Sequence, residues 1–568
     1  MTASEVTSIP ADVEACRRIV QRLAQVVGPT RKDLDRIRVD VCKELGVSAL
    51  PGNADLIRAL RPEEAWLKPL LTRKRTRTAS GVCVIAVMTK PLPCPLPQPC
   101  AYCPGGPSVG MPQSYTGREP ASLRGLQYGF DPYLQVRSRI EQLQAIGHTV
   151  DKVELILMGG TFTSHPLNYR EWFVQRCLDA ICKRDSHSLE EAKRNSEAAP
   201  IRNSGITIET RPDRCNEADV NEMLRMGVTR VELGVQTLQD EVYALVGRGH
   251  TVDDVVEATR VAKDSGLKVT YHMMPNLPGS TPQQDLDTFR TLFADPRFQP
   301  DALKIYPCLV IKGTRLYDWW QRGLYRAYTE RELLNLLVEA SRMIPPYVRV
   351  QRLNRDIPVP LIEAGPRRGD LRELVEKALS ETGYPCRCIR CREAGHVERR
   401  RGVMPLRDKV RLVRREYDAS GGREFFLSYE DLDADILVAY ARLRKPSEKA
   451  HRPELADAAV LRELHVCGPM LPVGAKPSAE WQHRGYGRLL LTEAERITRE
   501  ELGLKKLAVI SGLGVKGYYR RLSYVDDGPY MSRSLSSATA EGSAQSSSSA
   551  TALIHEESRP LILSGRPM

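Results

Sequence analysis

The chain has 568 residues, 42% of them hydrophobic and 27% charged, which is typical of a globular protein too long for one hydrophobic core. Its net charge of +12 favours an anionic partner, although charge alone cannot separate a nucleic acid from a membrane surface. With no apolar run near the roughly 18 residues of a membrane span and no secretory signal pattern, we expect a cytoplasmic protein without a membrane partner.

The first segment, 1–78, is predicted to be a basic helical region. Apolar residues recur at helical spacing between 11 and 70, among them Val20, Leu23 and Leu34. Five basic residues and no acidic one lie between Lys68 and Arg77. Such a run favours contact with an anionic partner.

The next segment, 79–370, is predicted to form a parallel barrel. Six strand-like runs lie at 82–88, 153–158, 206–210, 230–235, 268–274 and 302–306. Helical patterns separate them, for instance at 133–146, 216–226, 251–265 and 281–293. Strands that alternate with helices indicate a parallel α/β sheet, and six such units predict a partial (βα)6 barrel.

Unusual polar and glycine residues follow the predicted strands, where parallel barrels gather their reactive groups. Cys94, Cys100 and Cys103 follow the first strand, and three thiolates on one loop can hold three irons of a [4Fe–4S] cluster while the fourth iron stays open. A zinc knuckle or incidental cysteines are the alternative. The later strand ends carry Gly159, Gly160, Thr161, Glu209, Arg211 and Gln236.

A second cysteine cluster lies in 371–400, which we predict to be a zinc-binding linker. Cys386, Cys388 and Cys391 supply three sulfurs for a tetrahedral structural zinc ion, with His396 or a distant residue as the fourth ligand. Free cysteines are the alternative. Between Arg387 and Arg415 there are eleven Lys or Arg residues and three acidic ones, which predicts a basic surface that contacts RNA phosphates.

The segment 401–532 is predicted to be an α+β domain. Strand-like runs at 409–417, 424–429, 436–443 and 459–467 precede a helix at 486–502, a strand at 506–511 and a helical turn at 515–522. The remaining residues, 533–568, are rich in Ser, Ala, Thr and Gly and are predicted to be disordered.

The start of the long helix resembles the coenzyme A signature of GNAT acetyltransferases, Gln/Arg-x-x-Gly-x-Gly/Ala. Backbone N–H groups and the positive helix end would receive the pyrophosphate, and glycines permit its close approach. An ordinary helix-start turn is the alternative. The residues of this motif are Gln482, His483, Arg484, Gly485, Tyr486 and Gly487.

The residues around this motif fit the same interpretation. The strand before it would hold the pantetheine arm through the backbone of Glu463, Leu464, His465 and Val466. Tyr518 and Tyr519 follow the next strand, where the fold usually keeps a phenol near the thioester. We therefore expect acetyl-CoA as a co-substrate.

The sequence as a whole resembles the catalytic subunit of Elongator and its single-chain relatives in archaea and bacteria. The segments that carry the resemblance are AVMTKP (86–91), YCPGGP (102–107), SYTGREP (114–120), MGGTF (158–162), IETRPD (208–213), ELGVQT (232–237), KIYP (304–307), LHVCGPMLPVG (464–474), AVISGLG (508–514) and DGPYMS (527–532). The chain departs from the resemblance in two places. Its Cys-x5-Cys-x2-Cys loop is longer than the commonest radical S-adenosylmethionine spacing, and Cys467 stands where the family usually has tyrosine.

The resemblance implies roles for individual residues. The cysteine loop would hold the cluster, and S-adenosylmethionine or the substrate would contact Gly159, Gly160, Thr161, Glu209, Arg211, Glu232 and Gln236. An internal salt bridge is the alternative for Glu209 and Arg211. Lys152 matches a lysine of the acetyl-CoA site, with a solvated lysine as the alternative.

The resemblance also implies the reaction, that of a tRNA carboxymethyluridine synthase acting on the wobble uridine. A 5′-deoxyadenosyl radical would take hydrogen from the acetyl-CoA methyl group, the acetyl radical would add to carbon 5 of the base, and hydrolysis would release coenzyme A. The expected partners are the anticodon loop of tRNA, an electron-donor protein, and either other Elongator subunits or a second copy of the chain. The alternatives are a protein lysine acetyltransferase with the barrel as scaffold, and a non-catalytic tRNA-binding scaffold.

Overall fold

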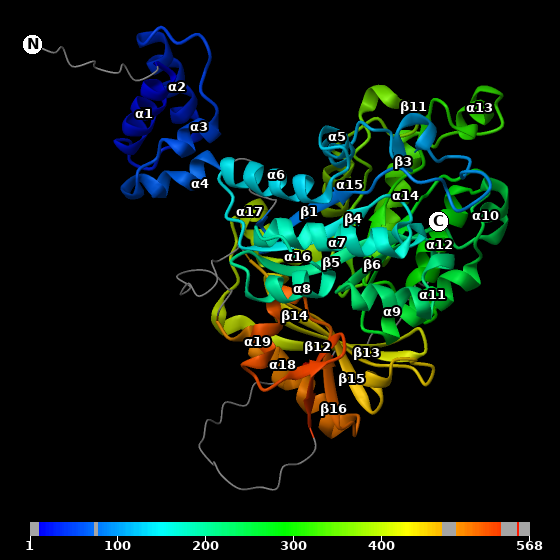
Figure 1. Cartoon of the computed structure of the whole chain (residues 1–568). Coiled ribbons are helices and arrows are strands. Elements are labelled where there is room, and N and C mark those ends of the chain that lie inside the picture. The colour runs from blue at the N-terminus through cyan, green and yellow to red at the C-terminus, as the bar shows by residue number, and fades with distance from the viewer. Residues whose placement is uncertain (1–10, 73–77, 469–483, 536–553, 556–568) are drawn as a thin grey trace, which may run out of the picture.

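The computed structural model describes residues 11–72, 78–468, 484–535 and 554–555, and Figure 1 shows its three parts in chain order. A small group of helices comes first, a sheet flanked by helices forms the middle, and a second sheet forms the C-terminal part. Among the described residues, no helix is long and apolar enough to cross a bilayer.

The N-terminal part is a helical cluster with its own apolar core. Ile19 and Leu23 pack there against Val41 and Leu56, which confirms the helical pattern of the sequence. Its helices are α1 (Ala11–Ala24), α2 (Arg31–Glu44), α3 (Asn53–Arg58) and α4 (Lys68–Leu71). Four of the five predicted basic residues, Arg73, Lys74, Arg75 and Arg77, lie outside the described residues.

The middle part is a parallel sheet of seven strands, in the order β1-β4-β5-β6-β7-β8-β10. The six predicted strands are present, and β10 (Arg349–Arg352) is an addition. The sequence does not reveal β10 because it is short and polar, with only Val350 buried. The other strands are β1 (Cys83–Met88), β4 (Lys152–Met158), β5 (Arg202–Thr210), β6 (Arg230–Gln236), β7 (Lys268–Met273) and β8 (Ala302–Ile305).

Helices cover this sheet and share one apolar core with it, because each presents a hydrophobic face to the strands. They are α6 (Pro132–Ala145), α7 (Leu167–Cys182), α8 (Leu189–Ala198), α9 (Glu217–Arg225), α11 (Val252–Asp264), α12 (Pro282–Ala294), α14 (Glu330–Met343) and α15 (Leu371–Glu381). Shorter elements lie at the rim: β2 (Gly105–Gly106), β3 (Met111–Gln113), α5 (Pro120–Gln127), α10 (Asp240–Val246), β9 (Val310–Ile311), α13 (Arg315–Gln321) and β11 (Ile362–Ala364).

The C-terminal part is a mixed sheet in the order β17-β18-β16-β15-β14-β13-β12-β19. Strands β15 and β16 pair in parallel only as far as Leu461 and Val509, although β15 continues to Val466. The two strands therefore part beyond Leu461. The bounds are β12 (Val410–Ala419), β13 (Gly422–Asp431), β14 (Ile436–Lys445), β15 (Ala458–Val466), α18 (Tyr486–Arg496), β16 (Lys506–Val509), α19 (Lys516–Arg520), β17 (Val525–Asp527), β18 (Tyr530–Ser534) and β19 (Ile554–His555).

The predicted boundary of the unstructured tail differs slightly from the structure. Strand β18 runs to Ser534 because its backbone pairs with β16, so the sequence-based boundary at 532 is two residues short. Ile554 and His555 also pair, with β12. Apart from 554–555, the tail beyond 535 lies outside the described residues.

The C-terminal part docks against the edge of the barrel where the strands begin. Two of its glycines make this close approach possible. A Cβ on Gly512 would lie 2.3 Å from the carbonyl oxygen of Ser204, and a Cβ on Gly514 would lie 2.6 Å from the backbone nitrogen of Asn203. Both partners belong to the first residues of β5, so the C-terminal domain covers the floor of the barrel.

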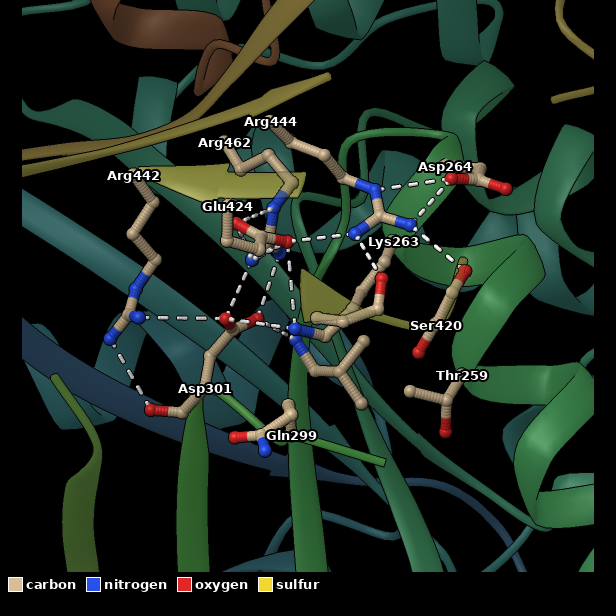
Figure 2. A network of polar contacts seen from close by, with 12 residues as sticks. Thr259, Lys263, Asp264, Gln299, Asp301, Ser420, Glu424, Arg442, Arg444 and Arg462 are labelled. Atoms are coloured by element: carbon tan, nitrogen blue, oxygen red, sulfur yellow. Dashed lines mark hydrogen bonds and ion pairs between the residues drawn. The ribbon is translucent and has the colours of Figure 1, made fainter. Parts of the chain in front are cut away.

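A buried network of charged side chains joins the two parts at this floor, and Figure 2 shows its arrangement. Arg462 of β15 donates to both carboxylate oxygens of Asp301, at 2.6 and 2.8 Å, just before β8. Arg444 of β14 donates to Asp264 of α11 at 2.6 Å. Glu424 accepts from both arginines. These side chains are at most 2% exposed, so each charge loses its hydration on folding. The ion pairs compensate for that loss.

Candidate active site

The cysteine loop follows β1 at the end of the barrel where the strands finish. The backbone holds it in place: Ala101 N–H donates to the carbonyl of Val246 at 2.8 Å, and Leu316 N–H donates to the carbonyl of Ala101 at 2.8 Å. Cys100 is buried, and the Arg248 guanidinium lies 3.7 Å from its sulfur.

The three loop sulfurs do not all lie as close together as the ligands of a single ion would. Among the described residues, three groups of potential ligands converge within 4.8 Å, and Cys94, Cys100 and Cys103 are not one of them. A single tetrahedral zinc ion with bonds of about 2.3 Å would need sulfurs closer together than that limit, whereas a four-iron cube holds its thiolates at separate corners. Burial and the neighbouring Cys100 raise the pKa of Cys103 to about 11, so the cysteine would lose its proton on ligation.

Two glycines after β4 provide close backbone approach next to this loop. Gly159 has φ +156°, and a Cβ there would lie 2.0 Å from Thr89 Oγ1. Gly160 has φ +83°, and a Cβ would lie 3.0 Å from the carbonyl oxygen of Gln113. Larger residues would strain the backbone and fill the space. The glycines thus let the turn after β4 pack closely against Thr89 and Gln113, and Gly160 also lines the cavity described below.

A charged cluster occupies the barrel interior between the strands. Glu232 on β6 pairs with the Lys304 ammonium on β8, and its other contact is His272 Nε2 on β7 at 2.9 Å. Burial opposes ionisation of Glu232, but Lys304 and His272 outweigh it and lower its pKa well below the usual value. The carboxylate therefore stays charged inside the barrel, and its second oxygen, Oε1, has no hydrogen-bond partner within the described part of the chain.

Sequence reasoning named Glu232 but missed His272 and Lys304. The available signal was a polar residue at an inward position of an apolar strand, His272 in KVTYHM and Lys304 in ALKI. Strands of a parallel sheet are largely buried, and the sequence of one strand does not show which side chains of the adjacent strands it will meet. These two residues therefore do not stand out in the sequence.

The structure gives Glu209 and Arg211 separate partners. Glu209 accepts a hydrogen bond from the Tyr115 hydroxyl at 2.6 Å, whereas Arg211 donates to Asp213 at 2.8 Å and to the carbonyl of Gly249 at 3.2 Å. Arg211 therefore does form an internal ion pair, but not with Glu209. Thr161 lies three residues beyond the end of β4, and Gln236 is the last residue of β6, where it takes the rare φ of +76°.

One cavity of about 1500 Å³ runs from the cysteine loop to the C-terminal domain. Cys100, Cys103 and Glu209 line its upper end, and Glu463 and Tyr518 line its lower end. The cavity passes through the barrel interior because the C-terminal domain covers the floor rather than a side. The two predicted sites are therefore parts of one continuous space.

The lower end of the cavity is charged. Glu463 accepts from Arg442 at 2.9 Å and lies 3.6 Å from Arg230. Burial opposes its ionisation, but Lys268, Arg442 and Arg230 lower the pKa of Glu463 to about 2. Lys152, at the start of β4, is also in the cavity wall, and burial lowers the pKa of its amine.

The helix that begins at the GNAT-like motif meets this end of the cavity. Gly485 precedes α18 with φ +90°, and a Cβ on Gly487 would lie 3.4 Å from the Tyr518 hydroxyl. Leu464 and Val466 pack toward the helix side of the sheet. Tyr519 is buried against Tyr524, and burial raises its pKa. Arg484 and Tyr486 lie within the described part, whereas Gln482 and His483 lie outside it.

The linker cysteines converge as a metal site would require. The sulfurs of Cys386, Cys388 and Cys391 lie within 4.8 Å of one another, and hydrogen bonds from its two neighbours lower the pKa of Cys388 well below the usual value. His396 does not join them. Its Nε2 lies 3.3 Å from Ser80 Oγ and 3.7 Å from Glu393. Cys391 belongs to α16 (Ile389–Arg392), whereas His396 belongs to the next helix, α17 (Ala394–Arg401), which directs its side chain toward Ser80.

The prediction of a basic surface between Arg387 and Arg415, which we call the basic stripe, needs a correction. The sequence predicts that the surplus of arginines between 387 and 415 faces solvent, but several of them are buried in ion pairs. Arg392 and Arg415 both pair with Glu430, and Arg414 pairs with Glu501 at 2.6 Å. These acidic partners belong to β13 and the end of the long helix, outside the stripe. Arg399 and Arg401 remain exposed.

A parallel barrel with a three-cysteine loop beyond its strand ends defines the radical S-adenosylmethionine class of protein, and the Radical SAM superfamily profile matches residues 94–292. The Radical_SAM C-terminal domain matches residues 300–381, and the ELP3 N-terminal domain matches 12–79. The chain belongs to the Elp3 family, as its relatives establish. Its superfamily implies S-adenosylmethionine and a [4Fe–4S] cluster, in agreement with the cysteine loop.

The relatives match over nearly their whole length. The "tRNA uridine(34) acetyltransferase" of Methanocaldococcus jannaschii is 49% identical over 89% of this chain and 95% of its own. The human "Elongator complex protein 3" is 46% identical over 89% of this chain and 93% of its own. The solved structure of Methanocaldococcus infernus Elp3 with an N-terminal deletion aligns with TM-score 0.72 at 46% identity, over 80% of this chain and 100% of that one. The resemblance predicted from the sequence is confirmed.

Proposed function

We propose that the chain is a tRNA carboxymethyluridine synthase that uses S-adenosylmethionine and acetyl-CoA to modify carbon 5 of the wobble uridine. The observation that carries this proposal is the single cavity of about 1500 Å³ between the cysteine loop and the C-terminal domain. A protein acetyltransferase would have no use for such a connection. The names of the archaeal relatives, which refer to uridine 34 of tRNA, support the choice of substrate.

We assign a function to each part of the chain. Residues 79–370 would be the radical barrel, 401–532 the GNAT domain and 1–78 an RNA-binding region. When bound, the cluster and S-adenosylmethionine would supply a carbon radical that can abstract hydrogen from an unactivated methyl group. Cys94, Cys100 and Cys103 would hold the cluster. The anticodon loop, an electron-donor protein and either Elongator subunits or a second copy of the chain would be its partners.

The chain's own side chains would divide the remaining work. The backbone of β15 beyond Leu461 is free of β16 and would hold the pantetheine arm, while the start of α18 would receive the pyrophosphate. Lys152 and Tyr518 would orient the thioester from the cavity wall. Enclosure within the barrel would exclude water from the radical. Cys386, Cys388 and Cys391 would bind a structural zinc ion.

A reconstituted assay tests the proposal. The anaerobic protein with iron and sulfide would receive a reductant, S-adenosylmethionine, methyl-deuterated acetyl-CoA and a tRNA with uridine at position 34. We expect 5′-deoxyadenosine that contains deuterium and a carboxymethylated nucleoside by mass spectrometry. A matched tRNA with cytidine at position 34 should give no modified base. Acetylation of lysine peptides in place of tRNA modification would favour the acetyltransferase alternative and refute ours.

The exposed part of the basic stripe should contact tRNA phosphates. Reversing Arg399 and Arg401 to glutamate is expected to weaken tRNA binding about tenfold or more and to flatten its salt dependence, because each lost phosphate contact removes one counterion release. The control reverses Arg290 and Arg331, exposed residues on outer barrel helices. Equal affinities and equal salt slopes for the two double variants would remove Arg399 and Arg401 from the interface.

A further inference from the structure

A second group of potential metal ligands lies between the linker and the C-terminal sheet. Glu393, His465 and Cys467 bring a carboxylate oxygen, an imidazole nitrogen and a sulfur within 4.8 Å of one another. His465 and Cys467 stand two residues apart around the end of β15 and point to the same side, while Glu393 directly precedes α17. Sequence reasoning gave Glu393 and Cys467 no role.

The distances inside this group fit ligands around one ion. Glu393 Oε1 lies 3.9 Å from His465 Nε2 and 3.9 Å from Cys467 Sγ. The first distance is too long for a hydrogen bond between nitrogen and oxygen. Tetrahedral zinc with bonds of about 2.0 Å to N or O and 2.3 Å to S separates its ligands by about 3.3–3.5 Å. A contraction of a few tenths of an ångström would therefore complete the coordination.

His465 supplies an independent observation. Its Nε2 is buried from solvent and has no hydrogen-bond partner within the described part of the chain. A buried imidazole nitrogen without a partner carries a desolvation cost that a bound ion would remove. Nε2 is also the atom that faces Glu393, so the unsatisfied group points into the cluster.

The other converging group outside the linker cysteines, Glu209, Glu232 and His272, differs in this respect. There the Lys304 ammonium already occupies Glu232, the Tyr115 hydroxyl occupies Glu209, and His272 Nε2 lies at hydrogen-bond distance from Glu232. The Lys304 ammonium therefore already supplies a cation to that cluster, and its imidazole Nε2 has a partner, although Glu232 Oε1 has none in the described part of the chain. In the group around Glu393, the imidazole Nε2 has no hydrogen-bond partner among the described residues, and the thiol makes only a weak contact with the carboxylate at 3.9 Å.

The surroundings of Glu393 resemble the outer shell of a metal site. Arg349 donates to both carboxylate oxygens at 2.5 and 2.8 Å, and the Ser80 hydroxyl donates to Oε2 at 3.1 Å. A carboxylate has about four lone-pair positions, so these bonds leave it able to bind an ion. Hydrogen bonds of this kind orient a ligating carboxylate. Glu393 is fully buried, which excludes competing water.

We propose that Glu393, His465 and Cys467 form a second zinc-class divalent metal site, which joins the start of α17 to the end of β15. Thiol, imidazole and carboxylate together are the donor set that zinc accepts and that magnesium and calcium do not. On binding, the Cys467 sulfur would exchange its proton for the metal, and the proton would leave to solvent. Three protein ligands leave the fourth position of a tetrahedral ion open. His465 also lines the central cavity, so the ion would stiffen the strand next to it.

Metal analysis of the full chain tests this site without any activity assay. The protein would be reconstituted anaerobically, washed with a weak chelator, and assayed for zinc and iron by mass spectrometry. We expect two zinc ions per chain in the parent, one in Cys467→Ala, and two in the matched control Cys177→Ala, which removes a buried thiol of α7 far from both groups in sequence. Cys388→Ala should also lose one zinc, from the linker group.

Cobalt substitution gives a second readout on the same variants. The cobalt-loaded parent minus the cobalt-loaded Cys467→Ala protein should show the charge-transfer and d–d absorption of a tetrahedral ion with one thiolate. Should Cys467→Ala fail to fold, the parent alone decides, because one zinc per folded chain refutes the second site. Unchanged zinc content in Cys467→Ala, or a flat cobalt difference spectrum, would equally leave the group as a polar network around Arg349.

Discussion

Cys100→Ala is expected to abolish 5′-deoxyadenosine formation and tRNA modification while leaving a folded protein. Cys100 is the buried member of the loop, and the carbonyl of its neighbour Ala101 anchors α13 through Leu316. Alanine preserves that backbone but removes one of three thiolates, and a four-iron cube that loses a protein ligand is not retained. The measurements are iron and sulfide content, visible absorbance and the yield of 5′-deoxyadenosine.

Cys308→Ala is the matched control for this prediction. Cys308 is buried in the same apolar cluster as Cys100, but its side chain does not line the cavity. The control should keep both its iron and its activity. Parent levels of 5′-deoxyadenosine from the Cys100→Ala protein would remove the loop from cluster binding and with it the radical chemistry.

Arg462→Met is expected to lower the free energy of unfolding by about 3–5 kcal/mol, the usual cost of removing one partner from a buried ion pair. Arg462 donates twice to Asp301 and also to Glu424, and its side chain is fully buried. Methionine fills a similar volume but leaves the two carboxylates short of a cation. Thermal and denaturant midpoints measure the effect.

The control for the network is Arg290→Met, which breaks an exposed pair with Asp287 on α12. An exposed pair contributes about 0–1 kcal/mol, so this variant should unfold close to the parent. If Arg462→Met also left the midpoints unchanged, the buried charges at the barrel floor would not hold the two parts together, and another part of the interface would have to do so.

The sequence predicted the architecture well where the pattern was local. The sequence correctly predicted apolar strands such as 153–158 and 230–235 and amphipathic helices such as 251–265. Burial against the sheet gives the apolar residues of each element a recognisable pattern along the sequence. Strand β10 was missed because only one of its four residues is buried. The cysteine loop was found because three thiols at short spacing are rare outside metal sites.

Side-chain contacts between residues far apart in the sequence could not be predicted from local patterns. Arg392 and Arg415 looked like free surface charges because their common partner, Glu430, lies 38 and 15 residues away. His272 and Lys304 gained a role only when the sheet placed them beside Glu232. His396 was a reasonable candidate ligand by spacing, yet its helix carries it toward Ser80.

The docking of the C-terminal domain on the barrel floor leaves β15 and the cysteine loop as distant parts of the wall of one cavity. Under the proposed function, coenzyme A would enter from the side of β15 and tRNA from the side of the cysteine loop. Neither would then block the entry of the other, so the two substrates would bind in either order, and coenzyme A would leave while tRNA stays bound.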